Sequence, residues 1–306
     1  MTGRFAPSPT GDLHIGNLRT AVLAWLSARS RRQRFVVRME DLDRQQSNVD
    51  NERTQLRDLA ALGLDWDGEV VRQSDRFPIY DAAIADLRTR GLVYECFCTR
   101  REILAEIAAS SAAPHGPPGS YPGTCRELDA SAVAAHRAAG RRPALRLRTD
   151  GHSVAFDDRV VGRVEGTVDD VVLRRNDGVP AYNLAVVVDD GAQGIDDVVR
   201  GDDLVSSTAR QIHLQRLLGL PQPTYTHVPL VLGTDGERLA KRHGAVTLGD
   251  LEAAGVSPGA VLTWIAGSVG LAAPGEPITL EHLVDRYDPS RLPTAPTVFD
   301  DPDTLV

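Results

Sequence analysis

The chain has 306 residues, of which 42% are hydrophobic and 25% are charged, and its formal net charge is -8 at pH 7. This length is enough for one large domain or two smaller ones with a substantial core. The negative charge argues against a protein that grips nucleic acid through bulk charge, although local arginine patches remain possible. The sequence has no apolar run that would span a bilayer and no secretory pattern at its start, so we expect a cytoplasmic protein without membrane contact.

The first predicted element is a short strand at Arg4 that leads through a turn rich in proline and glycine into an amphipathic helix. Ser8 and Gly11 stand in this turn, and His14 and Gly16 stand where the helix begins. A helix N-terminus favours phosphate because it offers free N–H groups and a positive partial charge. We expect His14 to donate to a phosphate oxygen and Gly16 to let a ring or a backbone come close. A solvated turn would explain the same residues.

A second strand is predicted over residues 35–39 and is followed by an acidic loop that starts at Glu40. Helices are predicted over residues 49–64 and 79–90. Carboxylates at the carboxyl end of a strand lie where open α/β sheets bind ligands, although a solvated acidic loop would have the same sequence. Strands that alternate with helices of this length predict βαβ units and a mainly parallel sheet, which places the chain in the α/β class.

The three cysteines of the chain, Cys96, Cys98 and Cys125, fall in one short segment. In a cytoplasmic protein this clustering favours a metal site over disulfide bonds. Three thiolates need a fourth ligand to complete a tetrahedral zinc site, and the spacing leaves Tyr121 and His115 as the candidates. Three unrelated buried thiols are the alternative without metal. We expect one structural zinc ion.

Residues 128–177 are rich in arginine and look like an insertion between two halves of a nucleotide-binding sheet. We expect this sheet to resume as a central strand over residues 179–188, which contains Tyr182. A continuous apolar run closed by acids is typical of a buried strand that ends at the ligand edge. Arg200 and a helix over residues 207–218 come next.

The last predicted strand, residues 227–232, leads into a glycine-flanked basic loop that contains Arg238 and Lys241. Lys241 is the only lysine among 34 basic residues, and a compact charge on a flexible stem suits a site that follows a moving phosphate. A solvated turn is again the alternative. Beyond this loop we expect short helices over residues 260–269 and 280–287, and a loosely ordered tail from Pro293 onward.

Two segments resemble the signatures of the class I aminoacyl-tRNA synthetases. The stretch from Arg4 to Asn17 is similar to the first signature, with Asn17 in place of its second histidine. The basic loop is similar to a degenerate second signature, in which Ala240 replaces a serine and Lys241 is the retained second lysine. Nearly the whole chain resembles the catalytic part of the glutamyl-tRNA synthetases, although Val186 stands where full-length enzymes have an asparagine.

The resemblance implies a Rossmann-type class I synthetase catalytic domain with an inserted zinc-containing subdomain and a short helical C-terminal region. It implies no anticodon-binding domain, because 61 residues after Ala245 (306 − 245) are too few for one. The implied segments are 1–95 for the first half of the nucleotide-binding domain, 96–178 for the inserted zinc-containing acceptor-type subdomain, 179–245 for the second half with the signature loop, and 246–306 for the C-terminal region.

The same resemblance assigns roles to individual residues. The glutamate-binding positions of the family fall on Arg4, Ser8, Glu40, Tyr182 and Arg200. The ATP-binding positions fall on His14, Gly16, Asn17, Arg238 and Lys241, and among these His14 and Lys241 are the catalytic pair. The zinc ligands fall on Cys96, Cys98, Tyr121 and Cys125, which favours Tyr121 over His115 by resemblance alone.

A truncated branch of this family activates glutamate with ATP and magnesium and transfers it to the queuosine base in the anticodon of tRNA(Asp). The resemblance to that branch implies glutamate, ATP and the tRNA(Asp) anticodon stem-loop as partners of a monomeric enzyme. Three alternatives stay open. They are a short glutamyl-tRNA synthetase that charges a tRNA 3′ end, a non-catalytic paralogue that binds tRNA or glutamate, and a small nucleotidyltransferase of the same superfold.

Overall fold

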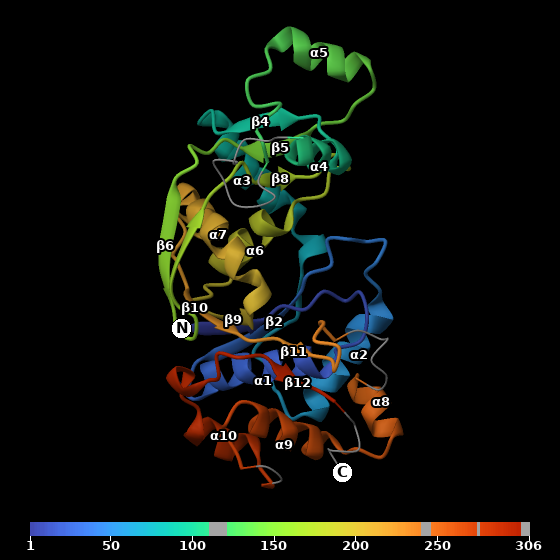
Figure 1. The fold of residues 1–306 in the computed structure, drawn as a ribbon, viewed down its shortest axis with the longest axis vertical. Coiled ribbons are helices and arrows are strands. Elements are labelled where there is room, and N and C mark those ends of the chain that lie inside the picture. The colour runs from blue at the N-terminus through green and yellow to red at the C-terminus, as the bar shows by residue number, and fades with distance from the viewer. Residues whose placement is uncertain (110–120, 240–245, 274–275, 301–306) are drawn as a thin grey trace.

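The computed structural model describes residues 1–109, 121–239, 246–273 and 276–300. Its largest sheet has seven strands in the order β3-β2-β1-β9-β10-β6-β7, and it crosses the middle of the molecule (Figure 1). Neighbouring strands run parallel, except in the antiparallel β6–β7 hairpin. In the sheet, β2 and β3 lie on one side of β1, and β9, β10, β6 and β7 lie on the other. The predicted α/β class with a mainly parallel sheet is confirmed.

The strands of this sheet are β1 (Thr2–Phe5), β2 (Arg34–Met39), β3 (Val71–Arg72), β6 (Ser153–Asp158), β7 (Gly162–Thr167), β9 (Asp197–Gly201) and β10 (Thr224–Val228). A second sheet contains β4 (Val93–Cys96), β5 (Ala144–Leu147) and β8 (Val172–Arg174), and β11 (Val231–Leu232) pairs with β12 (Thr297–Val298). The α-helices are α1 (Ile15–Arg29), α2 (Val49–Ala61), α3 (Phe77–Thr89), α4 (Arg100–Ala109), α5 (Ala130–Ala138), α6 (Tyr182–Ala192), α7 (Val205–Leu218), α8 (Leu248–Ala253), α9 (Pro258–Ser268) and α10 (Leu280–Arg286). Short 3-10 turns are η1 (Gln73–Asp75), η2 (Asp202–Leu204) and η4 (Pro289–Arg291).

Helix α1 lies across one face of the main sheet, where it contacts β1 and β9. Its apolar residues Ile15, Leu18, Val22 and Leu26 are fully buried in the largest hydrophobic core, which α9 and α10 close from the other side (Figure 1). Helix α7 packs against β6 and β7 in a separate core on the opposite side of the sheet. The sheet is therefore covered on both faces, as a parallel sheet requires. None of the described helices is long and apolar enough to cross a bilayer.

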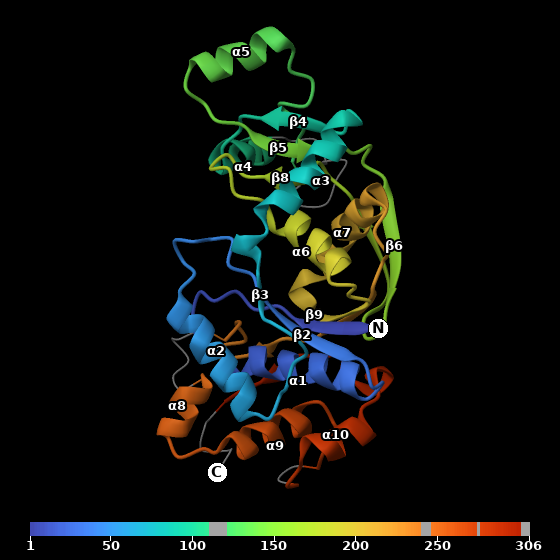
Figure 2. The ribbon, with the colours of Figure 1, turned by 180° about the vertical axis from the view of Figure 1, so that it is seen from behind.

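The second sheet and helices α4 and α5 form the end of the molecule farthest from α8, α9 and α10 (Figure 2). All of these distal elements lie within residues 93–174, but β6 and β7 from the same interval join the main sheet through the pairing of Tyr225 with Asp158. Whether residues 96–178 act as one inserted subdomain stays a prediction.

The central strand predicted over residues 179–188 is wrong, because this segment forms helix α6. Its apolar run lies between α3 and α7, and residues 184–187 are all buried. A short helix that is enclosed on several sides has no polar face, so its sequence cannot be distinguished from that of a buried strand. Val186 belongs to this core and does not line the cavity described below.

The predicted strand over residues 227–232 and the described part of the predicted loose tail, residues 293–300, also need correction, whereas residues 301–306 lie outside the described residues. Pro229 has no N–H group to donate to a ladder, and the strand divides there into β10 and β11. The tail forms β12, which pairs in parallel with β11, and Phe299 is buried against Trp264 at 5.3 Å between ring centroids. Residues 297–299 are held because they pair with β11 and place Phe299 in an apolar site that the sequence pattern does not reveal.

We predict that Asp189→Ala will lower the free energy of unfolding by about 3–5 kcal/mol, because Asp189 is a fully buried acceptor for three side chains. Its carboxylate accepts from Arg76 Nε at 2.6 Å, from Tyr80 Oη at 2.7 Å and from Gln73 Nε2 at 2.9 Å. Urea denaturation measures the change. Asp86→Ala, which removes an exposed carboxylate from α3, should change stability by less than about 1 kcal/mol. Equal effects of the two substitutions would contradict this role.

Candidate active site

A cavity of about 620 Å³ opens where the main sheet divides between β1 and β9. In parallel α/β sheets, ligands bind at the carboxyl ends of the strands beside such a division. The cavity is lined by nine of the ten residues predicted for glutamate and ATP: Arg4, Ser8, His14, Gly16, Asn17, Glu40, Tyr182, Arg200 and Arg238. The tenth, Lys241, lies outside the described residues. Positions far apart in sequence are thus brought to one place.

Arg4 on β1 and Glu40 after β2 both line the cavity and lie close enough for their opposite charges to interact. Arg4 is 4% exposed, and its Nη1 donates to the Val199 carbonyl oxygen at 3.2 Å. Its Nε lies 3.6 Å from Asp190 Oδ1 and has no hydrogen-bond partner in the described chain. Burial raises the pKa of Glu40, although the charges of Arg38 and Arg4 oppose this rise. The wall therefore offers both a cationic donor and a carboxylate.

Arg200 at the end of β9 is a buried cation without a carboxylate partner in the described chain. It is 5% exposed, its Nε donates to His227 Nε2 at 3.0 Å, and its Nη2 donates to Thr208 Oγ1 at 2.8 Å. Both partners are neutral when His227 carries no extra proton. An uncompensated buried charge is costly, so this wall of the cavity favours an anionic ligand.

Helix α1 presents its N-terminus to the same cavity, and His14 is its N-cap. His14 Nδ1 accepts from the Asn17 backbone N–H at 3.3 Å, while Asn17 Oδ1 accepts from the His14 backbone N–H at 3.3 Å. Burial and the nearby charge of Arg238 lower the pKa of His14 to about 4. Because Nδ1 accepts, the neutral ring carries its proton on Nε2, which can donate to a ligand oxygen.

Gly16 is closely packed against the cap itself. A Cβ atom at this position would lie 3.1 Å from two atoms of the His14 ring and 3.2 Å from Val231 Cβ. The His14 ring thus packs against Gly16, and the approach of a ligand to this glycine stays a prediction. Across the cavity, Arg238 Nη1 lies 2.8 Å from Asp203 Oδ2, which holds the start of the basic loop close to the end of β9.

Helix α2 holds the turn between β1 and α1 from behind. The side chain of Gln55 donates to the carbonyl oxygens of Ser8 at 3.0 Å and Gly11 at 2.7 Å, and Asn51 Nδ2 donates to the Pro9 carbonyl oxygen at 3.2 Å. Gln55 is 1% exposed. Sequence reasoning missed Gln55, because a glutamine on a predicted helix carries no signal that it faces a turn 44 residues away.

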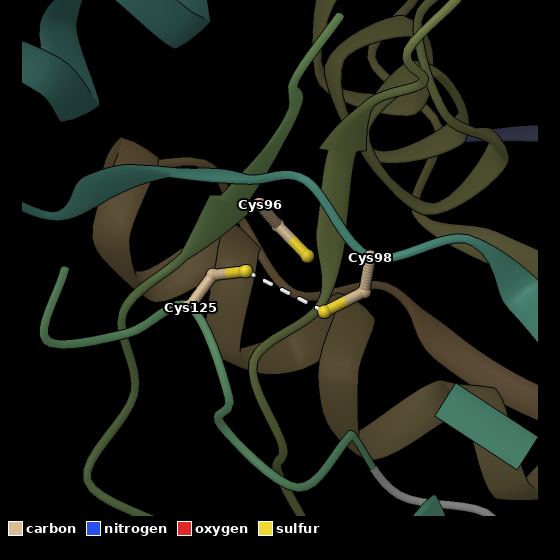
Figure 3. A group of neighbouring side chains, drawn as sticks. All are labelled: Cys96, Cys98 and Cys125. Carbon is tan, nitrogen blue, oxygen red and sulfur yellow. Dashed lines mark hydrogen bonds between the residues drawn. The ribbon is translucent and has the colours of Figure 1, made fainter. Parts of the chain in front are cut away.

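The three cysteines gather at the distal end of the molecule, and their sulfur atoms point toward one another (Figure 3). All three are free, and their Sγ atoms lie within 4.8 Å of one another, with Cys98 and Cys125 at 3.4 Å. The Tyr121 hydroxyl lies 3.3 Å from Cys96 Sγ and 3.6 Å from Cys98 Sγ. A tetrahedral zinc ion with bonds of about 2.3 Å holds its sulfur ligands roughly 3.8 Å apart, so the donor set fits that metal.

Of the two candidates for the fourth ligand, Tyr121 has its hydroxyl beside the sulfur atoms, and His115 lies outside the described residues. The Cys125 backbone N–H donates to the Tyr121 hydroxyl at 2.8 Å, and the guanidinium of Arg146 lies 3.8 Å from the centroid of the tyrosine ring. Burial raises the pKa of the Cys98 thiol to about 12. A thiolate there needs a neighbouring cation to become favourable, which a divalent metal would supply.

Comparisons with known proteins agree with this geometry. The family model described as "tRNA synthetases class I (E and Q), catalytic domain" matches residues 1–301. The glutamyl-Q tRNA(Asp) synthetase of Nocardia farcinica is 58% identical, over 98% of this chain and 93% of that protein. The glutamate--tRNA ligase 1 of Halorhodospira halophila is 43% identical, over 99% of this chain and 65% of that protein.

Among solved structures, the glutamate tRNA ligase of Elizabethkingia meningosepticum, crystallised in complex with its amino acid, is 25% identical and has a TM-score of 0.84. The match covers 100% of this chain and 68% of that one. The chain therefore belongs to the class I glutamyl and glutaminyl tRNA synthetase family, within its group of glutamyl-Q tRNA(Asp) synthetases.

Proposed function

We propose that the protein activates glutamate with ATP and transfers it to the queuosine base in the anticodon of tRNA(Asp). The observation that carries this proposal is the unpaired cation of Arg200, which faces the same cavity as the N-terminus of α1. The cavity thus offers one group that favours a carboxylate and another that favours a phosphate. The name of the Nocardia relative supports the choice of acceptor.

Glutamate carries two carboxylates and one ammonium group, so it needs two cationic partners and one anionic partner in this cavity. We assign its carboxylates to the guanidinium groups of Arg4 and Arg200, because a hydrogen bond between a guanidinium and a carboxylate is assisted by both charges. Glu40 supplies a negative partner for the α-ammonium group. Ser8 and Tyr182 line the same space and orient the amino acid through their hydroxyl groups.

Activation joins the α-carboxylate oxygen of glutamate to the α-phosphorus of ATP, and the bond to pyrophosphate breaks in line with it. Positioning and charge stabilisation supply most of the rate in such a transfer. The Nε2–H of His14 and the free N–H groups of α1 donate to the triphosphate. Lys241 and Arg238 neutralise the leaving pyrophosphate, and magnesium arrives with ATP as part of the substrate.

In the second step a hydroxyl of the nucleic acid attacks the carbonyl carbon of glutamyl-AMP. AMP leaves with the electron pair of the anhydride bond, and the hydroxyl proton passes to solvent or to the AMP phosphate. The product is a glutamyl ester of the tRNA. The acceptor named for the Nocardia relative makes that hydroxyl one of queuosine, whereas a terminal ribose is the acceptor of the alternative charging enzyme.

We also propose that Cys96, Cys98, Tyr121 and Cys125 hold one structural zinc ion. The metal would supply a cross-link between the end of β4 and the segment before α5, which carries two of the ligands. It lies in a different part of the fold from the cavity, so we assign it no step in the reaction. Residence in the cytoplasm and a monomeric state stay predictions.

We predict that the protein will exchange pyrophosphate into ATP with glutamate and with no other amino acid, without any tRNA. Lys241→Ala should reduce this exchange about 100-fold to 1000-fold, which is the loss of one preorganised electrostatic group. Arg163→Ala is the control, because Arg163 is an exposed cation on β7. Full exchange by Lys241→Ala would show that the role of Lys241 is wrong. Exchange that requires tRNA would favour the charging enzyme.

The acceptor is tested with two forms of tRNA(Asp), one with queuosine and one with guanosine at the same position. We expect labelled glutamate to enter only the first form, and to enter it equally well when the terminal CCA has been removed. This follows because the proposed acceptor is a hydroxyl of the base and not of the 3′ end. Labelling that depends on the CCA end would establish the alternative.

We predict that protein purified in the presence of zinc will contain one zinc ion per chain and that Cys125→Ser will lose it and unfold at a lower temperature. Loss of one of four ligands opens the site, and structural zinc contributes directly to folding. Elemental analysis and thermal denaturation measure the two effects, and Ser131→Ala on exposed α5 is the control. Absence of zinc from the unsubstituted protein would show that the three thiols are unrelated.

A further inference from the structure

Three adjacent strands of the main sheet carry a chain of hydrogen bonds that ends at Arg200. Asp158 is the last residue of β6, His227 lies in β10 and Arg200 lies in β9. Asp158 Oδ2 lies 2.7 Å from His227 Nδ1, and His227 Nε2 lies 3.0 Å from Arg200 Nε. His227 and Asp158 are both buried, and neither lines the cavity. Neither residue was singled out from the sequence.

The partners of the ring determine its protonation state. The Asp158 carboxylate also accepts from the backbone N–H groups of Val160 at 3.0 Å and Val161 at 2.9 Å. Burial raises the pKa of Asp158, but these donors and His227 outweigh it, so the pKa lies below its ordinary value and the group is an anion. An anion beside Nδ1 and a guanidinium donor beside Nε2 require a neutral ring with its proton on Nδ1.

The contacts of the guanidinium leave one of its nitrogens for a ligand. Its Nε donates to His227, its Nη2 donates to Thr208, and its central carbon lies 5.4 Å from the ring centroid of Tyr225. Within the described chain its Nη1 makes no hydrogen bond, and the residue lines the cavity. The side chain is thus held on the sides that face the protein.

We propose that His227 is a positioning residue for Arg200, and that the protein binds glutamate tightly only while this imidazole is neutral. The proposal rests on the role assigned above to Arg200. It adds that Asp158 fixes the ring through Nδ1 and that the ring fixes the guanidinium through Nε2. A protonated ring would lose its acceptor and would place a second cation 3.0 Å from Arg200 Nε.

Charged groups on four neighbouring elements act on this ring. Asp158 on β6 favours the protonated form of the ring, whereas Arg200 on β9 and Arg4 on β1 oppose it. Asp202 on η2 also lies close, and the charge of a protonated ring lowers the pKa of Asp202. Burial is the largest influence, and together these effects lower the pKa of His227 below 6.5. The ring is therefore neutral at pH 7 and takes up a proton only as the solution becomes acidic.

The test compares His227→Gln, which keeps an acceptor near the position of Nε2 but does not titrate, with His227→Phe, which has no acceptor. The assay is glutamate-dependent pyrophosphate exchange between pH 5 and pH 7.5. We expect His227→Phe to raise the KM for glutamate about tenfold or more and to leave the KM for ATP within about twofold, because a hydrogen bond to a charged group is lost at one ligand only. His227→Gln should recover most of this loss at pH 7.

The pH profile separates positioning from a merely structural role. In the unsubstituted protein the KM for glutamate should rise as the pH falls below about 6.5, the ordinary pKa of histidine. In His227→Gln this rise should be absent or much smaller, and Asp157→Asn, an exposed neighbour on β6, should behave like the unsubstituted protein. A rise that persists unchanged in His227→Gln overturns the proposal, as does a parallel rise of both KM values in His227→Phe.

Two further outcomes are distinguished by direct binding. If His227→Phe does not fold, which thermal denaturation reports, the pH profile of His227→Gln decides alone. If the unsubstituted protein shows no glutamate-dependent exchange, the proposed function has failed, and calorimetric titration with glutamate alone then tests His227. Binding that weakens in acid in the unsubstituted protein but not in His227→Gln would still support the positioning role.

Discussion

The structure depends on how its buried arginines are neutralised. Arg38 has no exposed surface, and its Nη1 lies 2.8 Å from Asp190 Oδ1 and 2.8 Å from Gln193 Oε1. The neighbouring Asp189 accepts from Gln73 of η1, from Tyr80 of α3 and from Arg76 between them. Both acids are carried by α6, so this helix compensates the cations beneath the cavity. A buried charge without such a partner costs several kcal/mol, which makes the place of α6 a condition for the fold.

The charge partners of the three arginines beside the cavity explain why it favours anions. Arg38 forms ion pairs with Asp190 and Glu40, and Arg4 lies 3.6 Å from Asp190. Arg200 donates only to neutral groups in the described chain. At the wall of the cavity, Arg200 is therefore a buried positive charge with no carboxylate partner in the described chain. The α1 N-terminus adds positive partial charge at another wall. A ligand that carries both a carboxylate and a phosphate, or two ligands that meet there, would satisfy both.

The cysteine cluster and the cavity illustrate two kinds of organisation. The cluster gathers residues from one segment of the chain, so local spacing in the sequence was enough to predict it. The cavity gathers residues from β1, from the loop after β2 and from α1, α6 and β9. These lie across nearly 200 positions, as the 195-residue separation between Arg4 and its partner Val199 shows. Only the family resemblance connected those positions before the structure brought them together.

By itself the sequence determined the elements whose pattern is local: the strand, turn and helix around His14, helices α2, α3, α7, α9 and α10 to within a few residues, and the α/β class. The family resemblance of its motifs also implied nine residues that line one cavity. Tertiary structure alone decided that residues 182–192 form a helix, that the tail supplies β12, and that Gln55, His227 and Asp158 support the site from behind. These features depend on what encloses an apolar run or receives a hydrogen bond, and such partners are supplied by distant parts of the chain.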